Sequence, residues 1–229
     1  MTSGMSARTP TPRPIRSVVF DLDGLMIDSE PIFEESARRL LARRERALLP
    51  HVLQAMLGVP ARDALKLFGE AHGLSETVEE LRIESARLFA EVAGEAPVPL
   101  MPGVLELLER LERKSIPKAI ATSSSARYVQ RILPPHDVLQ RFQFVLTCDD
   151  VRCGKPAPEI YQKAAARFGH TPAEMLVLED SPNGLRAAKA AGAICVVVPH
   201  ALVPLDALAG ADAILPSLLA PELLEMLGI

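Results

Sequence analysis

The 229-residue sequence contains no tryptophan, and aromatic residues make up only 4% of it. Proteins that bind single-stranded nucleic acids stack bases on aromatic side chains, so the scarcity of aromatic residues argues against a base-stacking surface. The net charge of −4 gives no attraction to nucleic acid or to an anionic membrane surface. We therefore expect neither nucleic acid nor a membrane among the partners.

Cysteines and long hydrophobic segments are also scarce. Three cysteines, Cys148, Cys153 and Cys195, are an odd number without metal-site spacing, which is typical of a reducing compartment. No apolar run reaches the roughly 18 residues of a transmembrane helix. Residues 1–14 lack the apolar segment of a signal peptide. We therefore predict a cytoplasmic protein with a flexible tail over residues 1–14, while the sequence does not indicate its oligomeric state.

The sequence does contain a buried-strand pattern that ends in two carboxylates. Val-Val-Phe at residues 18–20 is followed by Asp21, Asp23 and Gly24. Because side chains alternate along a strand, both carboxylates are expected to point to the same side. Two such charges repel each other unless a cation or a shared proton compensates. Ligands bind at this end of the strands in open α/β sheets, so the pattern predicts a functional site at the end of this strand.

The rest of the chain divides into a helical stretch and an alternating one. Residues 31–95 carry apolar residues at helical spacing. From residue 101 onward, predicted helices alternate with predicted strands, as in a parallel sheet covered on both faces. The helices are expected at 104–113, 126–133, 158–168, 184–191 and 218–227, and the strands at 117–121, 144–146, 175–178, 194–198 and 212–215.

This organisation predicts an α/β fold, a doubly wound parallel sheet with an inserted helical domain. Residues 15–30 and 98–229 would form the α/β core, and residues 31–97 a helical cap. A lobe joined by two connections beside a site-bearing strand is suited to act as a lid.

Four polar clusters follow predicted strands and would meet at one edge of the sheet. They are Asp21 with Asp23, residues 122–125 (Thr-Ser-Ser-Ser), Lys155, and residues 179–180 (Glu-Asp). Each cluster alone is also explained as a turn, a helix cap or a surface residue. Together they supply a carboxylate nucleophile, hydroxyl and amide donors, a cation and acids for a metal. Phosphoryl transfer requires this set.

In order and spacing, the four clusters resemble the four motifs of the haloacid dehalogenase superfamily. The helical insert resembles the cap of the branch that contains phosphoglycolate phosphatases and β-phosphoglucomutases. Within that branch, residues 121–125, 154–156 and 179–184 resemble the sugar-phosphate and pseudouridine 5'-phosphate phosphatases. The resemblance covers residues 15 to about 200 and implies a Rossmann-like core that acts on a small phosphorylated metabolite.

The resemblance also implies a role for each residue of the motifs. Asp21 would attack phosphorus and form an aspartyl-phosphate, and Asp23 would act as general acid and base. The Thr122 hydroxyl and the Ser123 amide would hold phosphoryl oxygens. Lys155 would neutralise charge and position the nucleophile, so it counts as both catalytic and phosphate-binding.

A Mg²⁺ cofactor follows from the same resemblance, since Mg²⁺ prefers hard oxygen ligands. The carboxylates of Asp21 and Asp180 and the main-chain carbonyl of Asp23 would hold the ion, with Glu179 close by or acting through water. Specificity residues are expected in the cap near residues 58–60, and the candidates there are His51 and Arg62.

Single positions separate related reactions. Asp23 favours phosphate esters, because dehalogenases and phosphonoacetaldehyde hydrolases lack this second acid. Phe33 and Ser125 stand where β-phosphoglucomutases usually have histidine and lysine. The prediction is a Mg-dependent phosphatase that hydrolyses a small monoester, a sugar phosphate or nucleotide-like monophosphate, through an aspartyl-phosphate. The alternatives are a β-phosphoglucomutase-like sugar-phosphate mutase and a non-catalytic phosphate-sensing or partner-binding protein.

Overall fold

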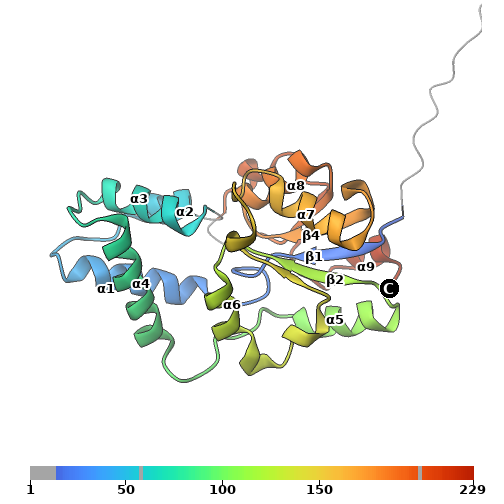
Figure 1. Cartoon of the computed structure of the whole chain (residues 1–229), viewed down its shortest axis with the longest axis horizontal. Coiled ribbons are helices and arrows are strands. Elements are labelled where there is room, and N and C mark those ends of the chain that lie inside the picture. The colour runs from blue at the N-terminus through green and yellow to red at the C-terminus, as the bar shows by residue number, and fades with distance from the viewer. Residues whose placement is uncertain (1–13, 57–58, 201–202) are drawn as a thin grey trace, which may run out of the picture.

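In the described part of the chain, six parallel strands form one sheet, which lies in the right-hand part of the molecule in Figure 1. The structure is a computed structural model that describes residues 14–56, 59–200 and 203–229. Residues 1–13 of the expected tail lie outside this range. The strand order is β3-β2-β1-β4-β5-β6. The strands are β1 (Ser17–Phe20), β2 (Lys118–Ala121), β3 (Val145–Leu146), β4 (Met175–Glu179), β5 (Ile194–Val197) and β6 (Ala213–Ile214).

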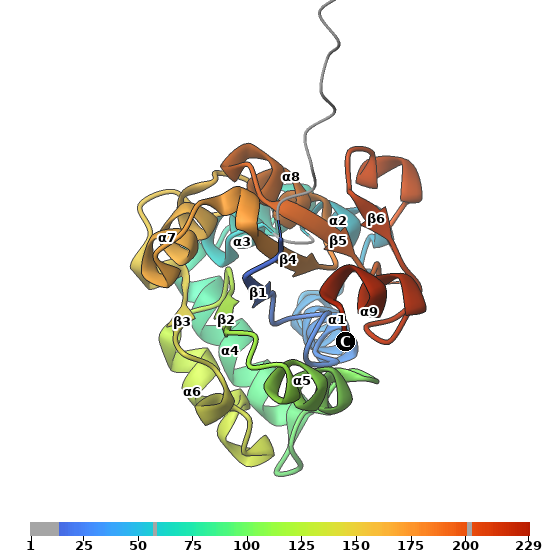
Figure 2. The same cartoon turned by 90° about the vertical axis from the view of Figure 1, so that its right-hand side faces the viewer.

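Helices cover both faces of this sheet (Figure 2). One face packs against α5 (Val104–Arg113), α6 (Ala126–Ile132) and α9 (Pro221–Leu227), and the other against α7 (Glu159–Phe168) and α8 (Pro182–Ala191). Strand β1 shows the alternation that separates the two layers, because Val18 and Phe20 belong to the first and Val19 to the second. The predicted doubly wound parallel sheet is therefore confirmed.

Two helices begin at a proline, and their first residues differ from the predicted ones. Helix α9 begins at Pro221, whereas the sequence pattern predicted residue 218. Helix α8 begins at Pro182, two residues earlier than predicted, and the Ser181 side chain caps it by accepting from the Gly184 amide. Proline suits the first helical turn because its ring fixes φ and that turn needs no amide donor.

Among the described residues, the lobe between β1 and α5 contains four helices: α1 (Glu30–Ala42), α2 (Pro50–Met56), α3 (Ala61–Ala71) and α4 (Val78–Ala93). A separate apolar cluster fills it, consisting of Leu40, Leu41, Val52, Phe68, Leu81 and Leu88. Its two connections lie side by side, since the Asp28 amide donates to the Pro99 carbonyl and the Met101 amide to the Met26 carbonyl. The exact boundaries of the predicted cap, residues 31–97, stay a prediction.

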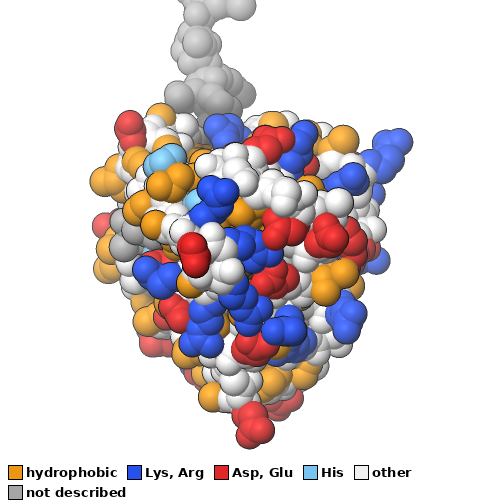
Figure 3. Space-filling model, turned by 90° about the vertical axis from the view of Figure 1, so that its left-hand side faces the viewer, with side chains coloured by type: hydrophobic (Ala, Val, Ile, Leu, Met, Phe, Trp, Pro, Cys, Tyr) orange, Lys and Arg blue, Asp and Glu red, His pale blue; other side chains and the backbone are white. Residues whose placement is uncertain are grey.

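The arginines of α1 and the following turn are paired with glutamates. Arg44 contacts Glu76 and Glu84, both at 2.6 Å, and Arg43 contacts Glu84 at 3.1 Å. Figure 3 shows positive and negative side chains intermingled over the end of the lobe that faces away from the sheet. This pairing supports a charged helical surface more than a site that attracts anions. Among the described residues, no helix is long and apolar enough to span a membrane.

The 3₁₀ segments lie in connections around the sheet: η1 (Pro134–His136), η2 (Leu139–Arg141), η3 (Cys148–Asp150), η4 (Pro172–Glu174) and η5 (Leu205–Leu208).

Candidate active site

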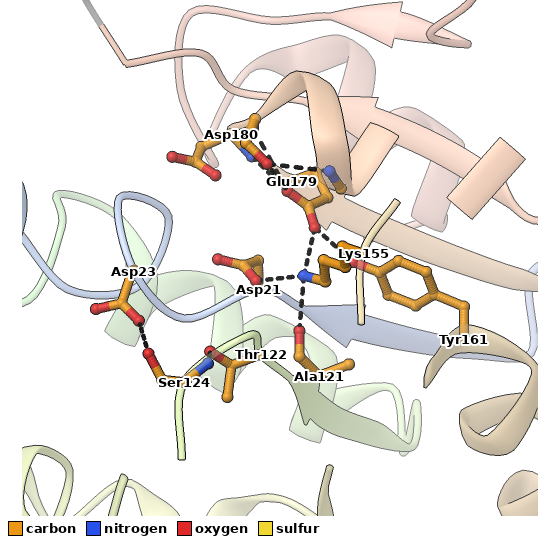
Figure 4. Close-up of polar contacts among 11 residues, drawn as sticks. Asp21, Asp23, Ala121, Thr122, Ser124, Lys155, Tyr161, Glu179 and Asp180 are labelled. Carbon is orange, nitrogen blue, oxygen red and sulfur yellow. Dashed lines mark hydrogen bonds and ion pairs between the residues drawn. The ribbon is translucent and has the colours of Figure 1, made fainter. Parts of the chain in front are cut away.

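The four polar clusters meet at the carboxyl edge of the sheet (Figure 4). Asp21 directly follows β1, and its amide donates to the Leu178 carbonyl on β4. Thr122 directly follows β2, and its amide donates to the Leu146 carbonyl on β3. Chain order reverses at β1, where β2 lies on one side and β4 on the other, so this edge has the topology of a ligand site.

Lys155 joins these clusters through its ammonium group. Its Nζ donates to Asp21 Oδ1, to Glu179 Oε1 at 2.6 Å and to the Ala121 carbonyl at 3.0 Å. An ammonium has three hydrogens, so these three acceptors satisfy it fully. Burial alone would lower the pKa of Lys155, but Asp21 and Glu179 outweigh that effect and hold the pKa above its usual range. Lys155 is therefore a buried, permanently charged group beside Asp21.

Glu179 is fully buried and heavily hydrogen-bonded. Besides Lys155, its carboxylate accepts from the Tyr161 hydroxyl, the Ser181 hydroxyl (3.1 Å) and the Asp180 amide (3.2 Å). A β-carbon at Gly184 would lie 1.8 Å from this carboxylate, so only glycine leaves room for it. These contacts favour a role for Glu179 in orienting Lys155 over direct coordination of a metal ion.

Asp21, Glu179 and Asp180 form a buried carboxylate cluster whose nearest oxygens all lie within 4.8 Å of one another. Burial, only partly offset by Lys155, raises the pKa of Asp21 to about 7. Burial and the neighbouring charge of Asp21 raise the pKa of Asp180 well above its usual range. Burial is the main cause of both shifts, and repulsion from the neighbouring carboxylates adds to it. The hard oxygen donors of this cluster fit a divalent cation.

Gly24 lets the backbone approach this cluster. A β-carbon there would lie 2.2 Å from Asp180 Oδ2, and the φ of Gly24 is +79°. We expect Gly24→Ala to displace the Asp180 carboxylate and to weaken divalent-cation binding by about tenfold or more. Isothermal titration calorimetry with Mg²⁺ measures this effect.

Gly192→Ala is the matched control for this substitution. Its φ of +84° carries similar backbone strain, but nothing lies within 4 Å of the added carbon. Each variant should lose about 1–2 kcal/mol of folding stability from the backbone alone, because an L side chain is disfavoured at positive φ. Equal cation affinity in the two variants would show that the close approach at Gly24 is unimportant.

Asp23 lies in different surroundings from Asp21, although both follow β1. Its Oδ1 accepts from the hydroxyls of Ser29 and Tyr128, each at 2.8 Å, and its Oδ2 accepts from the Ser124 hydroxyl at 2.6 Å. Burial and the charge of Asp23 raise the pKa of Tyr128 above its usual range, so this hydroxyl stays a donor. The Asp21 carboxylate is thus bonded to an ammonium group, and the Asp23 carboxylate accepts hydrogen bonds from three hydroxyls.

The hydroxyl residues that follow β2 make different contacts. Thr122 is buried, and its hydroxyl oxygen accepts from the Ser124 amide at 3.0 Å. The Ser123 hydroxyl oxygen is buried and has no hydrogen-bond partner among the described residues. Ser125 caps α6 by accepting from the Tyr128 amide. Thr122 therefore lies at the edge of the sheet on the side of Asp21 (Figure 4), while Ser125 acts as a helix cap. The phosphate-binding roles of Thr122 and Ser123 stay a prediction.

His51 and Arg62, the candidate specificity residues, are exposed on α2 and α3. Within the part of the chain that the structure describes, neither is bonded to the carboxylates. A β-carbon on Gly154, next to Lys155, would lie 2.8 Å from Pro60, so the start of α3 touches the loop that carries Lys155. This contact places Arg62 near the boundary between lobe and core, and the specificity assignment stays a prediction. Gly58 in the same region lies outside the described residues.

The sequence did not indicate that the hydroxyls of Ser29, Tyr128, Tyr161 and Ser181 would donate to carboxylates of the site. Tyr128 and Tyr161 are the sole tyrosines in the chain, and each bonds to a carboxylate of the site. Their rarity was an available signal, since buried tyrosines usually hydrogen-bond through the hydroxyl. The sequence does not indicate which carboxylate each one reaches.

Comparison with known proteins gives consistent matches. The model of the haloacid dehalogenase-like hydrolase family matches residues 15–192. The phosphorylated carbohydrates phosphatase of Thermotoga maritima is 33% identical over 91% of this chain and 95% of its own length. The validoxylamine A 7'-phosphate phosphatase of Streptomyces hygroscopicus subsp. limoneus is 36% identical over 87% and 92%. The crystal structure of CbbY from Rhodobacter sphaeroides in complex with phosphate superposes with a TM-score of 0.80, at 26% identity over 94% and 100% of the chains.

Proposed function

Because the chain belongs to the haloacid dehalogenase-like hydrolase family, we propose that it is a phosphatase of small phosphate monoesters. The substrate would be a sugar phosphate or a nucleotide-like monophosphate, and the reaction would pass through an aspartyl-phosphate on Asp21. The named activities of two relatives, a carbohydrate-phosphate phosphatase and a validoxylamine phosphate phosphatase, support this substrate class.

The proposal rests on the different hydrogen-bond partners of the two aspartates. Asp21 has Lys155 on Oδ1, which leaves Oδ2 to attack phosphorus. Asp23 has no ammonium partner among the described residues and is held by hydroxyls instead. Two carboxylates in such different surroundings are suited to different roles, one as nucleophile and one as acid and base.

In the first step, Asp21 Oδ2 forms a bond to phosphorus while the bond to the ester oxygen breaks. Asp23 gives its proton to that oxygen, so the substrate leaves as an alcohol. In the second step, Asp23 takes a proton from water, whose oxygen attacks phosphorus and releases phosphate from Asp21. Thr122 and Ser123 would bind the phosphoryl oxygens, and Lys155 would offset their charge.

Asp21 and Asp180 would hold a Mg²⁺ ion by their carboxylates and Asp23 by its carbonyl oxygen. The raised pKa values of the two carboxylates support this assignment, since a nearby cation would stabilise their charged forms. When bound, Mg²⁺ lowers the repulsion between the nucleophile and the phosphate dianion. A cytoplasmic location stays a prediction from the cysteine pattern.

The test is phosphate release from a panel of sugar phosphates, nucleoside monophosphates and 4-nitrophenyl phosphate. Turnover should require Mg²⁺, fall to background with excess EDTA and return when Mg²⁺ is restored. Release that is insensitive to the chelator would contradict the metal assignment, and no release from any ester would contradict the phosphatase proposal. Isomerisation of a sugar phosphate with little free phosphate, in the presence of a bisphosphate, would favour the mutase instead.

Phe33 supports hydrolysis over the mutase reaction. Its ring packs against Phe89 with centroids 4.8 Å apart, in the position where the mutases usually have histidine. A hydrocarbon ring neither donates nor accepts a proton, so this position adds no second acid or base beside Asp23.

A further inference from the structure

We infer that Tyr128 is a positioning residue that fixes the Asp23 carboxylate for proton transfer and connects it to the helical lobe. The inference rests on the proposed function, because it concerns the acid that would protonate the leaving group. Tyr128 lies on α6, outside the four motifs, and 105 residues separate it from Asp23.

The hydroxyl of Tyr128 is the most constrained of the three donors to Asp23. The side chains of Ser29 and Ser124 are short, and each hydroxyl turns about a single bond to find its acceptor. The tyrosine hydroxyl stands at the end of a rigid ring, so its position is set by the packing of that ring. Its 2.8 Å bond to Asp23 Oδ1 therefore restricts the rotation of the carboxylate.

The ring of Tyr128 is held by two aromatic residues of the lobe. Phe89 on α4 meets it edge-on, with centroids 5.6 Å apart and an interplanar angle of 68°. Phe33 on α1 lies 6.2 Å away at 30°. These distances are in the favourable range for aromatic pairs. Phe33 and Phe89 belong to the first and last helices of the lobe, so a shift of either helix would move the hydroxyl that holds Asp23.

Ser29 makes a second connection between Asp23 and the helical lobe, at the same carboxylate oxygen. Ser29, which precedes α1, forms no side-chain cap of that helix and donates to Asp23 instead. Oδ1 of Asp23 thus receives one hydroxyl from the start of the lobe and another from a core helix whose ring the lobe braces. We therefore expect the rate of leaving-group protonation to depend on the packing of lobe against core.

Tyr128→Phe removes the hydroxyl and keeps the ring. For a sugar phosphate that the unmutated protein hydrolyses, single-turnover phosphorylation of Asp21 should slow by about 10- to 100-fold, because an alkoxide leaves poorly without a proton. For 4-nitrophenyl phosphate, the burst of nitrophenolate should slow by less than about threefold, because this leaving group needs no proton. KM for the sugar phosphate should stay near its original value.

Phe89→Leu keeps the hydroxyl and removes the ring that braces it. We expect the same selective loss with the sugar phosphate, at a smaller magnitude, so this variant provides a reading even where Tyr128→Phe fails to fold. Phe168→Leu is the matched control, since Phe168 packs against Phe144 on the opposite layer of the sheet. Melting temperatures of all three variants report their folding.

Equal slowing with both substrates would assign Tyr128 a merely structural role and overturn the inference. Unchanged rates in Tyr128→Phe would overturn it as well, while leaving the phosphatase proposal intact. Failure of the unmutated protein to release phosphate from either ester would overturn the proposed function, and this inference with it.

Discussion

Asparagine in place of Asp21 is expected to abolish turnover with almost no change of shape. The amide has the size of the carboxylate but is not a nucleophile toward phosphorus, so no aspartyl-phosphate forms. We expect kcat to fall by at least about 10⁴-fold, as for removal of other covalent nucleophiles. Phosphate release from the best substrate of the panel measures this loss, and mass spectrometry of the quenched reaction should show no phosphorylated protein.

Folding stability should not fall with activity in this variant. The pKa of Asp21 is about 7 in the folded chain, against an ordinary value of 3.8. A group with a raised folded pKa binds more protons when folded, so its ionisation lowers stability as pH rises from about 4 to about 7. The substituted amide carries no such charge. Lys155 keeps Glu179 as an ion-pair partner in this variant. In metal-free buffer at pH 7.5, Asp21→Asn should therefore unfold at the same denaturant concentration as the unmutated protein or a higher one.

Asp63→Asn is the control for this experiment, because Asp63 is an exposed residue of α3 outside the carboxylate cluster. It should retain full activity. Residual turnover of Asp21→Asn within about tenfold of the unmutated protein would rule out Asp21 as the nucleophile. Loss of stability at pH 7.5 would show instead that its carboxylate supports the fold.

Most of the fold could be predicted because its signals are local. Helix 104–113 has the predicted bounds, and strand 175–178 gains one residue. Hydrophobic periodicity and the end of each apolar run are properties of neighbouring residues, which a single sequence contains. The predicted start of α9 is wrong because Leu218 is buried in the core before the helix begins, and a buried residue at this spacing also fits a helical pattern.

The sheet topology predicts where the four clusters lie, but it does not predict which side chains form hydrogen bonds with them. Parallel strands bring their carboxyl ends to one edge, so Asp21, Thr122 and Glu179 were expected to be close together. The hydrogen-bond partners of Glu179 could not be predicted in the same way. Its bonds to Lys155 and Tyr161 depend on the exact rotation of α7 and on the path of the preceding loop. These are long-range packing results, on which the sequence pattern contains no information.

Replacing Lys155 by methionine should damage both the fold and the reaction. Methionine fills a similar volume but leaves Asp21 and Glu179 buried without their shared cation. Breaking a buried ion pair from one side costs about 3–5 kcal/mol, so we expect a loss of this size in the free energy of unfolding. Activity should fall below detection, because the nucleophile loses the group that orients it. Urea unfolding with circular dichroism measures the first effect.

Two further variants separate the charge of Lys155 from its packing. Lys163→Met removes a partly exposed lysine that pairs with Glu159, and it should cost less than about 1 kcal/mol. Adding Glu179→Gln to Lys155→Met removes one uncompensated carboxylate, so it should restore part of the stability without restoring activity. A double variant as unstable as Lys155→Met would mean that the lysine stabilises the fold by packing alone. Recovery of stability without turnover would show that activity is lost because Asp21 lacks the ammonium of Lys155, and not because the protein unfolds.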